Sequence, residues 1–268
     1  MLVVIKGAGD LASGIALRLH RSRFDIIMTD LPVPTAVRRT VAFSEAIRLG
    51  NSCVEDVRAE RAESVEEVLD CLSRGVIPVI PDPEANIIKV VKPDVVVDAI
   101  IAKRNTGTSL GDAPLVIGVG PGFTAGVDCD AVVETMRGHT LGRVIREGSA
   151  IPNTGIPGNI GGQSINRLIR ASADGVFHPE KEIGDIVREG ECVANIDGVP
   201  VFANTGGIIR GMLQDGITVR KGMKSGDVDP RGESVDFMSA SDKALAIGGG
   251  VLEAIMSKYG NLIKAEKK

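Results

Sequence analysis

The stretch that decides the predicted fold is Leu2-Val3-Val4-Ile5-Lys6-Gly7-Ala8-Gly9-Asp10, at the start of the chain. An apolar, β-branched run leads here directly into a glycine-rich turn. Apolar residues then recur with helical spacing from Leu11 to Leu19. A second apolar run, residues 24–29, ends at Asp30. The sequence therefore predicts a strand, a glycine turn, a helix and a second strand that ends at an acidic side chain.

This order is typical of the first βαβ unit of a Rossmann-like nucleotide-binding domain. Gly7 permits the tight turn, and Gly9 lacks the Cβ that would keep a phosphate from the positive end of the helix. Gly14 lets the helix lie close to the sheet. Asp30 follows Gly9 by 21 residues, a position from which a carboxylate can bond a ribose hydroxyl.

Asp10 leaves the ligand of this turn open. It stands where a pyrophosphate would rest, and its carboxylate would repel phosphate. The alternative is that Asp10 caps a helix that begins at Leu11 and needs no ligand. A turn without an anion, or one that serves a cationic or neutral ligand, is compatible with both.

Composition limits the classes of function. The 268 residues suit two modest domains, with 43% apolar and 25% charged residues. A net charge of −4 and only 3% aromatic residues argue against a nucleic-acid partner. No apolar run is long enough to span a membrane, and the start has no signal-peptide layout, so we expect a cytoplasmic protein. The four cysteines lack CxxC spacing, which predicts reduced thiols and no metal site.

Polar residues gather at the end of a later strand. The run 95–101 is nearly continuous in apolar residues, as in a central parallel strand, and it contains Asp98. Lys103, Arg104 and Asn105 follow directly, where ligands of open α/β sheets bind. The alternative is a buried Asp98 paired with one of those bases in an ordinary polar loop.

Two further carboxylates follow the strand at residues 115–120. Asp128 and Asp130 are two residues apart in a loop that contains Gly122 and Gly126. They suit a cation site or an acid/base pair, or alternatively turn and capping roles.

A repeat marks the second half of the chain. Shifting the sequence by 32 residues aligns Gly175 with Gly207 and Arg188 with Arg220. Two such four-strand units, facing each other, would form a barrel-sandwich similar to the biotinyl/lipoyl type. The expected tip, residues 196–204, has no Lys, so covalent biotin or lipoate is not expected. The Gly- and Pro-rich residues 148–162 are expected either to fold over the first domain's site or to be a flexible insertion.

The predicted architecture is thus α/β plus β. A Rossmann-like parallel-sheet domain takes residues 1–137, and a barrel-sandwich hybrid β domain with the 32-residue repeat takes residues 138–238. A C-terminal helix and tail take residues 239–268, and Gly248-Gly249-Gly250 in that helix indicates close backbone packing or a break near a ligand.

Five segments resemble the YqeB-type family of selenium-dependent molybdenum hydroxylase accessory proteins, and the first domain is similar to XdhC-type maturation factors. These segments are residues 6–14, 97–106, 119–128, 138–142 and 153–158. The resemblance implies maturation of a molybdenum hydroxylase, with that hydroxylase or its cofactor as partner. It implies a step that installs selenium or sulfur at the metal centre.

The leading hypothesis is an accessory protein that binds a nucleotide-like ligand or the molybdopterin dinucleotide cofactor. The alternatives are an NAD(P)-dependent oxidoreductase, with Asp128 or Asp130 exchanging the proton, and a non-catalytic scaffold. No catalytic residue is assigned, and the oligomeric state, a homo-oligomer included, is open. The candidate cofactor-binding residues are Gly7, Gly9, Asp10, Gly14, Asp30, Asp98, Lys103, Arg104 and Asn105.

Overall fold

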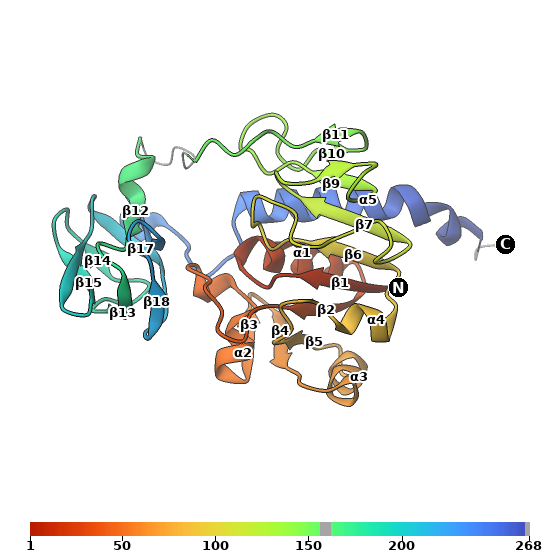
Figure 1. Ribbon diagram of the computed structural model, residues 1–268, viewed down its shortest axis with the longest axis horizontal. Coiled ribbons are helices and arrows are strands. Elements are labelled where there is room, and N and C mark those ends of the chain that lie inside the picture. Colours follow the sequence, from red (N-terminus) through yellow and green to blue (C-terminus); the bar gives the residue numbers. More distant parts are fainter. Residues whose placement is uncertain (156–161, 266–268) are drawn as a thin grey trace. The chain divides into compact units, whose positions relative to one another are not determined.

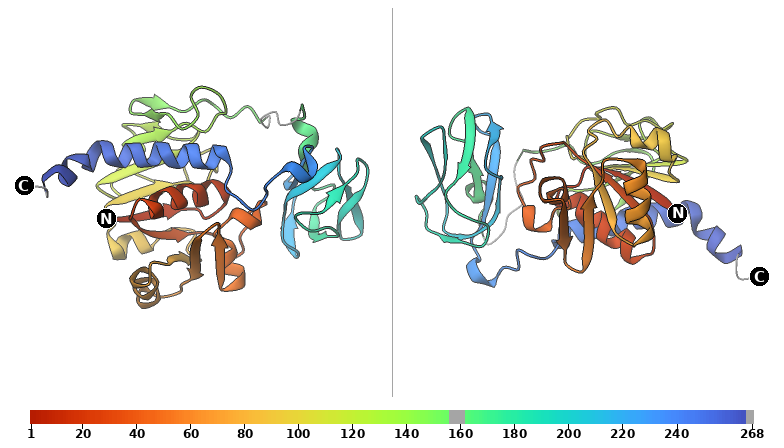
Figure 2. Two further views of the ribbon diagram at one scale, coloured as in Figure 1. Left: turned by 180° about the vertical axis from the view of Figure 1, so that it is seen from behind. Right: turned by 90° about the horizontal axis from the view of Figure 1, so that it is seen from below.

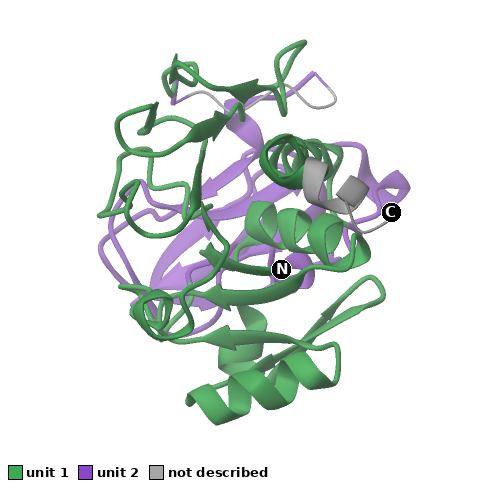
Figure 3. Cartoon of the chain, turned by 90° about the vertical axis from the view of Figure 1, so that its right-hand side faces the viewer, with its two compact units in different colours: residues 1–34, 43–153, 240–268 green, residues 35–42, 154–239 purple. Residues whose placement is uncertain are grey.

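The computed structural model describes residues 1–155 and 162–265, in two compact units (Figure 3). Unit 1 comprises residues 1–34, 43–153 and 240–268, and unit 2 comprises residues 35–42 and 154–239. This division differs from the boundaries expected at residues 137 and 238, because residues 138–153 and the C-terminal helix belong to unit 1. The described residues contain no helix that is both long and apolar enough to cross a membrane. Where in the cell the protein works stays a prediction.

Unit 1 is built on a nine-stranded sheet with the order β10-β9-β7-β6-β1-β2-β5-β4-β3 (Figure 1). Its strands are β1 (Leu2–Lys6), β2 (Asp25–Thr29), β3 (Asn51–Val54), β4 (Val57–Arg61), β5 (Ile77–Ile80), β6 (Val95–Asp98), β7 (Leu115–Val119), β9 (Ala131–Val133) and β10 (Val144–Ile145). The central strand β1 pairs in parallel with β2 and with β6. A separate two-stranded sheet joins β8 (Thr124–Ala125) to β11 (Gly148–Ser149).

The fold class expected from the sequence is wrong in its sheet. The large sheet is mixed rather than parallel, because β3–β4 at one edge and β9–β10 at the other are antiparallel. Only Glu55 and Asp56 separate β3 from β4, and a connection this short can join only antiparallel strands. Unit 2 adds two curled antiparallel sheets, so we do not describe the chain as a Rossmann-like domain followed by a biotinyl-like one.

Helices cover both faces of the large sheet (Figure 2). One face carries α1 (Asp10–Arg21) and α5 (Asp242–Ala265), which lie side by side. On the other face, Val68 of α3 (Val65–Ser73) and Ile87 of α4 (Ile87–Val91) pack on Val4 and Val96. A short α2 (Glu45–Leu49) packs near the β3–β4 edge. Ser64 caps α3, since the Glu67 N–H donates to Ser64 Oγ at 3.2 Å.

Unit 2 consists of two four-stranded antiparallel sheets, β12-β19-β17-β14 and β16-β15-β13-β18. The strands are β12 (Leu168–Arg170), β13 (Gly175–Pro179), β14 (Ile186–Val187), β15 (Cys192–Ile196), β16 (Val199–Phe202), β17 (Gly207–Met212), β18 (Ile217–Val219) and β19 (Lys224–Asp229), with single 3-10 turns at Ile165–Arg167 and Gly232–Ser234. β13 and β17 begin 32 residues apart, as do β15 and β19. Strands of one repeat pair with strands of the other: β14 of the first repeat pairs with β17 of the second, and β18 of the second pairs with β13 of the first.

Residues 35–42, which we call the crossing segment, lie in the sequence between two parts of unit 1 but belong to unit 2. Met212 N–H donates to the Val37 carbonyl at 2.8 Å, and Arg39 Nε donates to the Met212 carbonyl at 2.8 Å. A 3-10 turn, Arg39–Val41, follows in the same segment. The sequence contains no signal for this crossing. Residues 156–161 of the glycine-rich linker lie outside the described residues, so its expected role over a site stays a prediction.

Candidate ligand site at the carboxyl edge of the large sheet

Two oppositely charged side chains lie next to each other in unit 1. The parallel register of β1 and β6 sets Lys6 beside Asp98, both on the sheet face that carries α3 and α4. The Lys6 Nζ lies 3.6 Å from Asp98 Oδ2. Lys6 is only 5% exposed and Asp98 only 1%. A buried charge of either sign is costly unless it is paired, so the ion pair lowers the free-energy cost of burying each of the two charges.

Thr108 completes this buried cluster. Lys6 Nζ donates to Thr108 Oγ1 at 2.6 Å, and this hydroxyl donates to Asp98 Oδ2 at 2.6 Å. The other Asp98 oxygen accepts the backbone N–H of Ile100 at 3.2 Å. An ammonium has three N–H donors. Within residues 1–155 and 162–265, Lys6 Nζ donates to Thr108 Oγ1 and forms an ion pair with Asp98 Oδ2, and no other acceptor is near it. At least one donor of a buried cation is therefore left for a ligand or a water molecule.

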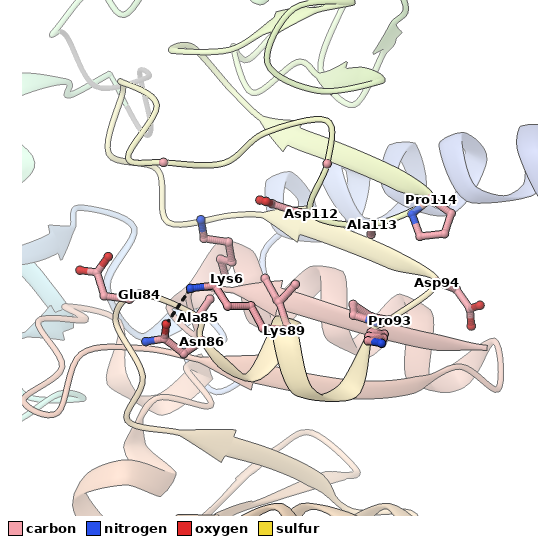
Figure 4. A pocket seen from close by; sticks show the side chains of 14 residues that line it. Lys6, Glu84, Ala85, Asn86, Lys89, Pro93, Asp94, Asp112, Ala113 and Pro114 are labelled. Carbon is pink, nitrogen blue, oxygen red and sulfur yellow. Dashed lines mark hydrogen bonds between the residues drawn. The ribbon is translucent and has the colours of Figure 1, made fainter.

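Lys6 lines a pocket of about 950 Å³, a size suited to a small molecule. Its walls come from α4 with the turn before it and from the loop between β6 and β7. In Figure 4 the side-chain nitrogens of Lys6 and Lys89 lie at the same end of the pocket as Glu84 and Asn86, whereas Asp94 lies at the other end. Two ammonium groups, a carboxylate and an amide thus lie at one end of the pocket, which we call its polar end.

The glycine turn after β1 is tightly packed on one side and open on the other. Gly7 has φ +95°, and a Cβ there would lie 2.9 Å from the Ala99 carbonyl oxygen, so this position requires glycine. Gly9 is the N-cap of α1, and a Cβ there would meet nothing within 4 Å. Asp10 is the first residue of the helix rather than its cap. The alternative interpretation, in which Asp10 caps a helix that begins at Leu11, is therefore wrong.

Asp30 holds this turn in place. Its Oδ2 accepts the Ala8 N–H at 2.8 Å, and its Oδ1 accepts the Leu31 N–H at 2.7 Å. Burial raises the pKa of this carboxyl above its usual value, and the two backbone hydrogen bonds oppose that rise. Each oxygen already has a donor within the fold, and a bond to a ribose hydroxyl stays a prediction.

The loop after β6 has an unusual backbone. Ile101 and Lys103 both have positive φ, of 60° and 62°, which is rare for residues other than glycine and costly for a β-branched side chain. A Cβ at Gly122 would lie 2.6 Å from the Arg104 Cα, so the loop packs directly on that glycine. Lys103 and Arg104 are exposed and have no hydrogen bond or ion pair among the described residues. Neither base pairs with Asp98, contrary to one expectation.

The remaining predicted polar residues support loops. Asn105 donates to the Thr108 carbonyl at 2.8 Å and to Asp128 Oδ1 at 3.1 Å. Asp128 Oδ2 accepts the Thr124 N–H at 2.7 Å, and Asp130 Oδ2 accepts the Val116 N–H at 2.7 Å. These contacts favour the turn roles over a cation site or an acid/base pair. Across the described residues no group of three or more His, Cys, Asp or Glu could hold a metal ion.

Sequence reasoning missed three residues of this site. Lys6 and Thr108 were not among the candidates, and Lys89 belongs to a helix that was not expected. The available signal for Lys6 was its position at the end of an otherwise apolar strand, where a buried ammonium needs an acidic neighbour. Gly14 is the opposite case, because a Cβ there would lie 2.5 Å from the Ala244 Cβ, so this glycine allows α1 to pack against α5.

Sequence comparison places the chain beside one named protein. No family model matches it. It is 51% identical over 267 residues to "Uncharacterized protein YqeB" of Escherichia coli strain K12. The chain is similar to YqeB over its whole length. The alignment covers all of this chain and 49% of YqeB, so the chain spans about half the length of that relative. This similarity supports the YqeB part of the resemblance, and the link to molybdenum hydroxylases is not shown by this relative.

Comparison with solved structures gives only low similarity. An aspartoacylase family protein of Mesorhizobium loti has 10% identity and a TM-score of 0.27, with 85% of this chain and 84% of that one covered. The ectoine utilization protein EutE (DoeB) of Ruegeria pomeroyi has 12% identity, a TM-score of 0.27 and the same coverage. A succinylglutamate desuccinylase/aspartoacylase of Rhodobacter sphaeroides has 22% identity and a TM-score of 0.22, over 25% of this chain and 22% of that one.

These comparisons do not support the function expected from the sequence. The structures named above are aspartoacylase and desuccinylase family proteins and an ectoine utilization protein, and none is a molybdenum hydroxylase maturation factor. Hydroxylase maturation and selenium insertion are therefore not proposed for this chain. At TM-scores of 0.22 to 0.27 the activities of those proteins are not carried over to it either.

Proposed function

We propose that unit 1 binds a small molecule bearing a carboxylate or a single phosphate in the pocket beside Lys6. The observation that carries this proposal is a buried ammonium with one unused N–H donor at the wall of a cavity of about 950 Å³. Asp98 and Thr108 hold that ammonium in one position, so little side-chain entropy is lost when a ligand binds. Lys89 supplies a second, exposed ammonium from α4.

Titration calorimetry with inorganic phosphate and small carboxylates tests the proposal. The variant Lys6→Met with Asp98→Asn removes both charges together and so avoids leaving one unpaired in the core. A lost charge-assisted hydrogen bond costs about 1.5–3 kcal/mol, so its Kd should rise about ten-fold or more. Lys221→Met in unit 2 changes an equally long but exposed side chain and should bind as the wild type does.

The same titrations include NAD and NADP, which stay predictions as ligands of the glycine turn. A nucleotide that binds equally well to wild type and to the double variant would place its site away from Lys6. Equal affinity of both proteins for every anion would disprove the proposal.

A further inference from the structure

Glu84 lies at the end of the pocket where the two ammonium groups lie (Figure 4). It is exposed and has no hydrogen bond or ion pair among the residues that the structure describes. Lys89, by contrast, donates to Asn86 Oδ1 at 3.2 Å, and Lys6 is held by Asp98. The polar end of the pocket thus contains a carboxylate that has no partner among the described residues.

The backbone presents Glu84 in a fixed way. Pro83 precedes it, and the next residue, Ala85, is 3% exposed with φ +51°. Asp82 closes the turn from both sides, because its carbonyl accepts the Ala85 N–H at 3.0 Å and its Oδ2 accepts the Ile87 N–H at 2.9 Å. A rigid, partly strained turn therefore holds the backbone of Glu84 at the rim of the pocket.

The charges at this end of the pocket sum to zero. Lys6 and Lys89 contribute two positive charges, and Asp98 and Glu84 contribute two negative charges. A polyphosphate would carry several negative charges to a neutral site and would meet the Glu84 carboxylate, which is unfavourable. A ligand with one charge of each sign has no such cost.

The other charged residues of the lining, Lys92, Asp94 and Asp112, add one positive and two negative charges, so they do not favour a polyanion either. Asp94 lies at the far end, where its Oδ2 accepts the Leu2 N–H at 2.8 Å. Asp112 accepts the Ser109 N–H and hydroxyl, each at 3.1 Å. Lys92 ends α4, close in sequence to Asp94.

We infer that the ligand of this pocket is a small zwitterion, in which an ammonium group lies a few bonds from a carboxylate or a single phosphate. Lys6 and Lys89 bind its anionic group, and Glu84 binds its ammonium group. The inference rests on the proposed function, because it assumes that the pocket binds an anion, and it adds the class of molecule that carries the anion.

Calorimetry on the full chain with matched pairs of probes tests this inference. O-phospho-L-serine is compared with 3-phosphoglycerate, which has a hydroxyl in place of the amine, and L-glutamate is compared with glutarate. Wild-type protein should bind the amine member of at least one pair about ten-fold more tightly, which corresponds to about 1.4 kcal/mol. Glu84→Gln should abolish that preference and leave the affinity for the amine-free member unchanged.

Glu147→Gln is the matched control, because Glu147 is also exposed and unpaired among the described residues of unit 1 but does not line the pocket. It should keep the amine preference. If wild type binds both members of each pair equally, or keeps its preference in Glu84→Gln, the zwitterion inference is wrong while the anion site stands. If none of the four probes binds, the proposed function fails, and the inference fails with it.

Discussion

Gly14 of α1 lies directly against Ala244 of α5, and a Cβ added at Gly14 would stand 2.5 Å from the Ala244 Cβ. Gly248 of α5 faces the same helix, since a Cβ there would lie 2.8 Å from the Gly14 carbonyl oxygen. Two glycines from opposite ends of the sequence thus allow the helices to touch backbone to backbone. This contact joins the C-terminal helix to unit 1.

Gly14→Ala should therefore destabilise unit 1, although alanine is the better helix former. Overpacking costs about 1–3 kcal/mol, against about 1 kcal/mol gained in helix propensity. Gly249→Ala is the control, because Gly249 is exposed in the same contact helix and a Cβ there meets nothing within 4 Å. Urea unfolding should show a loss for the first variant and a gain of up to about 1 kcal/mol for the second. Equal effects would contradict the close helix contact.

Gly7→Ala should distort the turn after β1. Alanine there is strained by φ +95° and also collides with the Ala99 carbonyl. Gly50→Ala meets the same backbone strain, at φ +86°, with open space around the new Cβ. We expect a cost of about 1 kcal/mol at Gly50 and a clearly larger one at Gly7. Thermal unfolding of both variants measures the difference, and a smaller loss at Gly7 would refute it.

Lys6 and Asp98 should be strongly coupled in their effect on stability. Lys6→Met or Asp98→Asn alone leaves a buried charge without its partner, which costs about 3–5 kcal/mol. The double variant leaves no charge, so it should lose much less than the sum of the single losses. A double-mutant cycle by urea unfolding measures the coupling, and additive losses would show that the pair does not interact.

The lowered pKa of the Asp229 carboxyl predicts how the stability of unit 2 responds to acid. Burial would raise the pKa of this carboxyl, but hydrogen bonds from Arg231 and the charges of Arg210 and Arg231 hold it below the usual 3.8. The folded state therefore binds fewer protons than the unfolded chain in this range. The stabilising contribution is fully present above about pH 4 and is lost as the pH falls through the folded value.

Arg231→Gln should shift acid unfolding of unit 2 to higher pH. The Arg231 side chain is 51% exposed, so the loss at pH 7 should stay below about 1 kcal/mol. Arg220→Gln, which removes an exposed arginine of the same unit, should leave the acid midpoint unchanged. Circular dichroism between pH 7 and pH 2 measures both midpoints, and coinciding midpoints would rule out this role of Arg231.

Local pattern predicted many elements of unit 1 well. The strand expected at residues 2–5 is β1, the run 24–29 contains β2, and the helix expected within residues 239–268 is α5. The β3–β4 hairpin and α4 were not predicted, since short elements carry little periodic signal. This omission is why a parallel sheet was expected where the sheet is mixed.

The sequence indicated the position of Asp98 in the sheet but not the residues that it contacts. Asp98 was expected near the carboxyl edge, where it lies, but its partner is Lys6, 92 residues earlier in the chain. Asn105 and Asp30 were chosen as ligand-binding groups, and their side chains bind backbone N–H groups of nearby turns. A sequence shows which residues can donate or accept, and not which partners the fold brings within reach.

The sequence by itself determined the local conformation: the strand that runs into the Gly7 turn, the cap of α3 at Ser64, and the 32-residue spacing of equivalent strands in unit 2. Each depends on neighbours in the chain, through alternation, capping and steric freedom at glycine. Only the tertiary structure decided that Lys6 faces Asp98, that Gly14 faces Ala244, and that residues 35–42 belong to unit 2. Those relationships join residues far apart in sequence, and they arise from strand register and close packing, which no local pattern encodes.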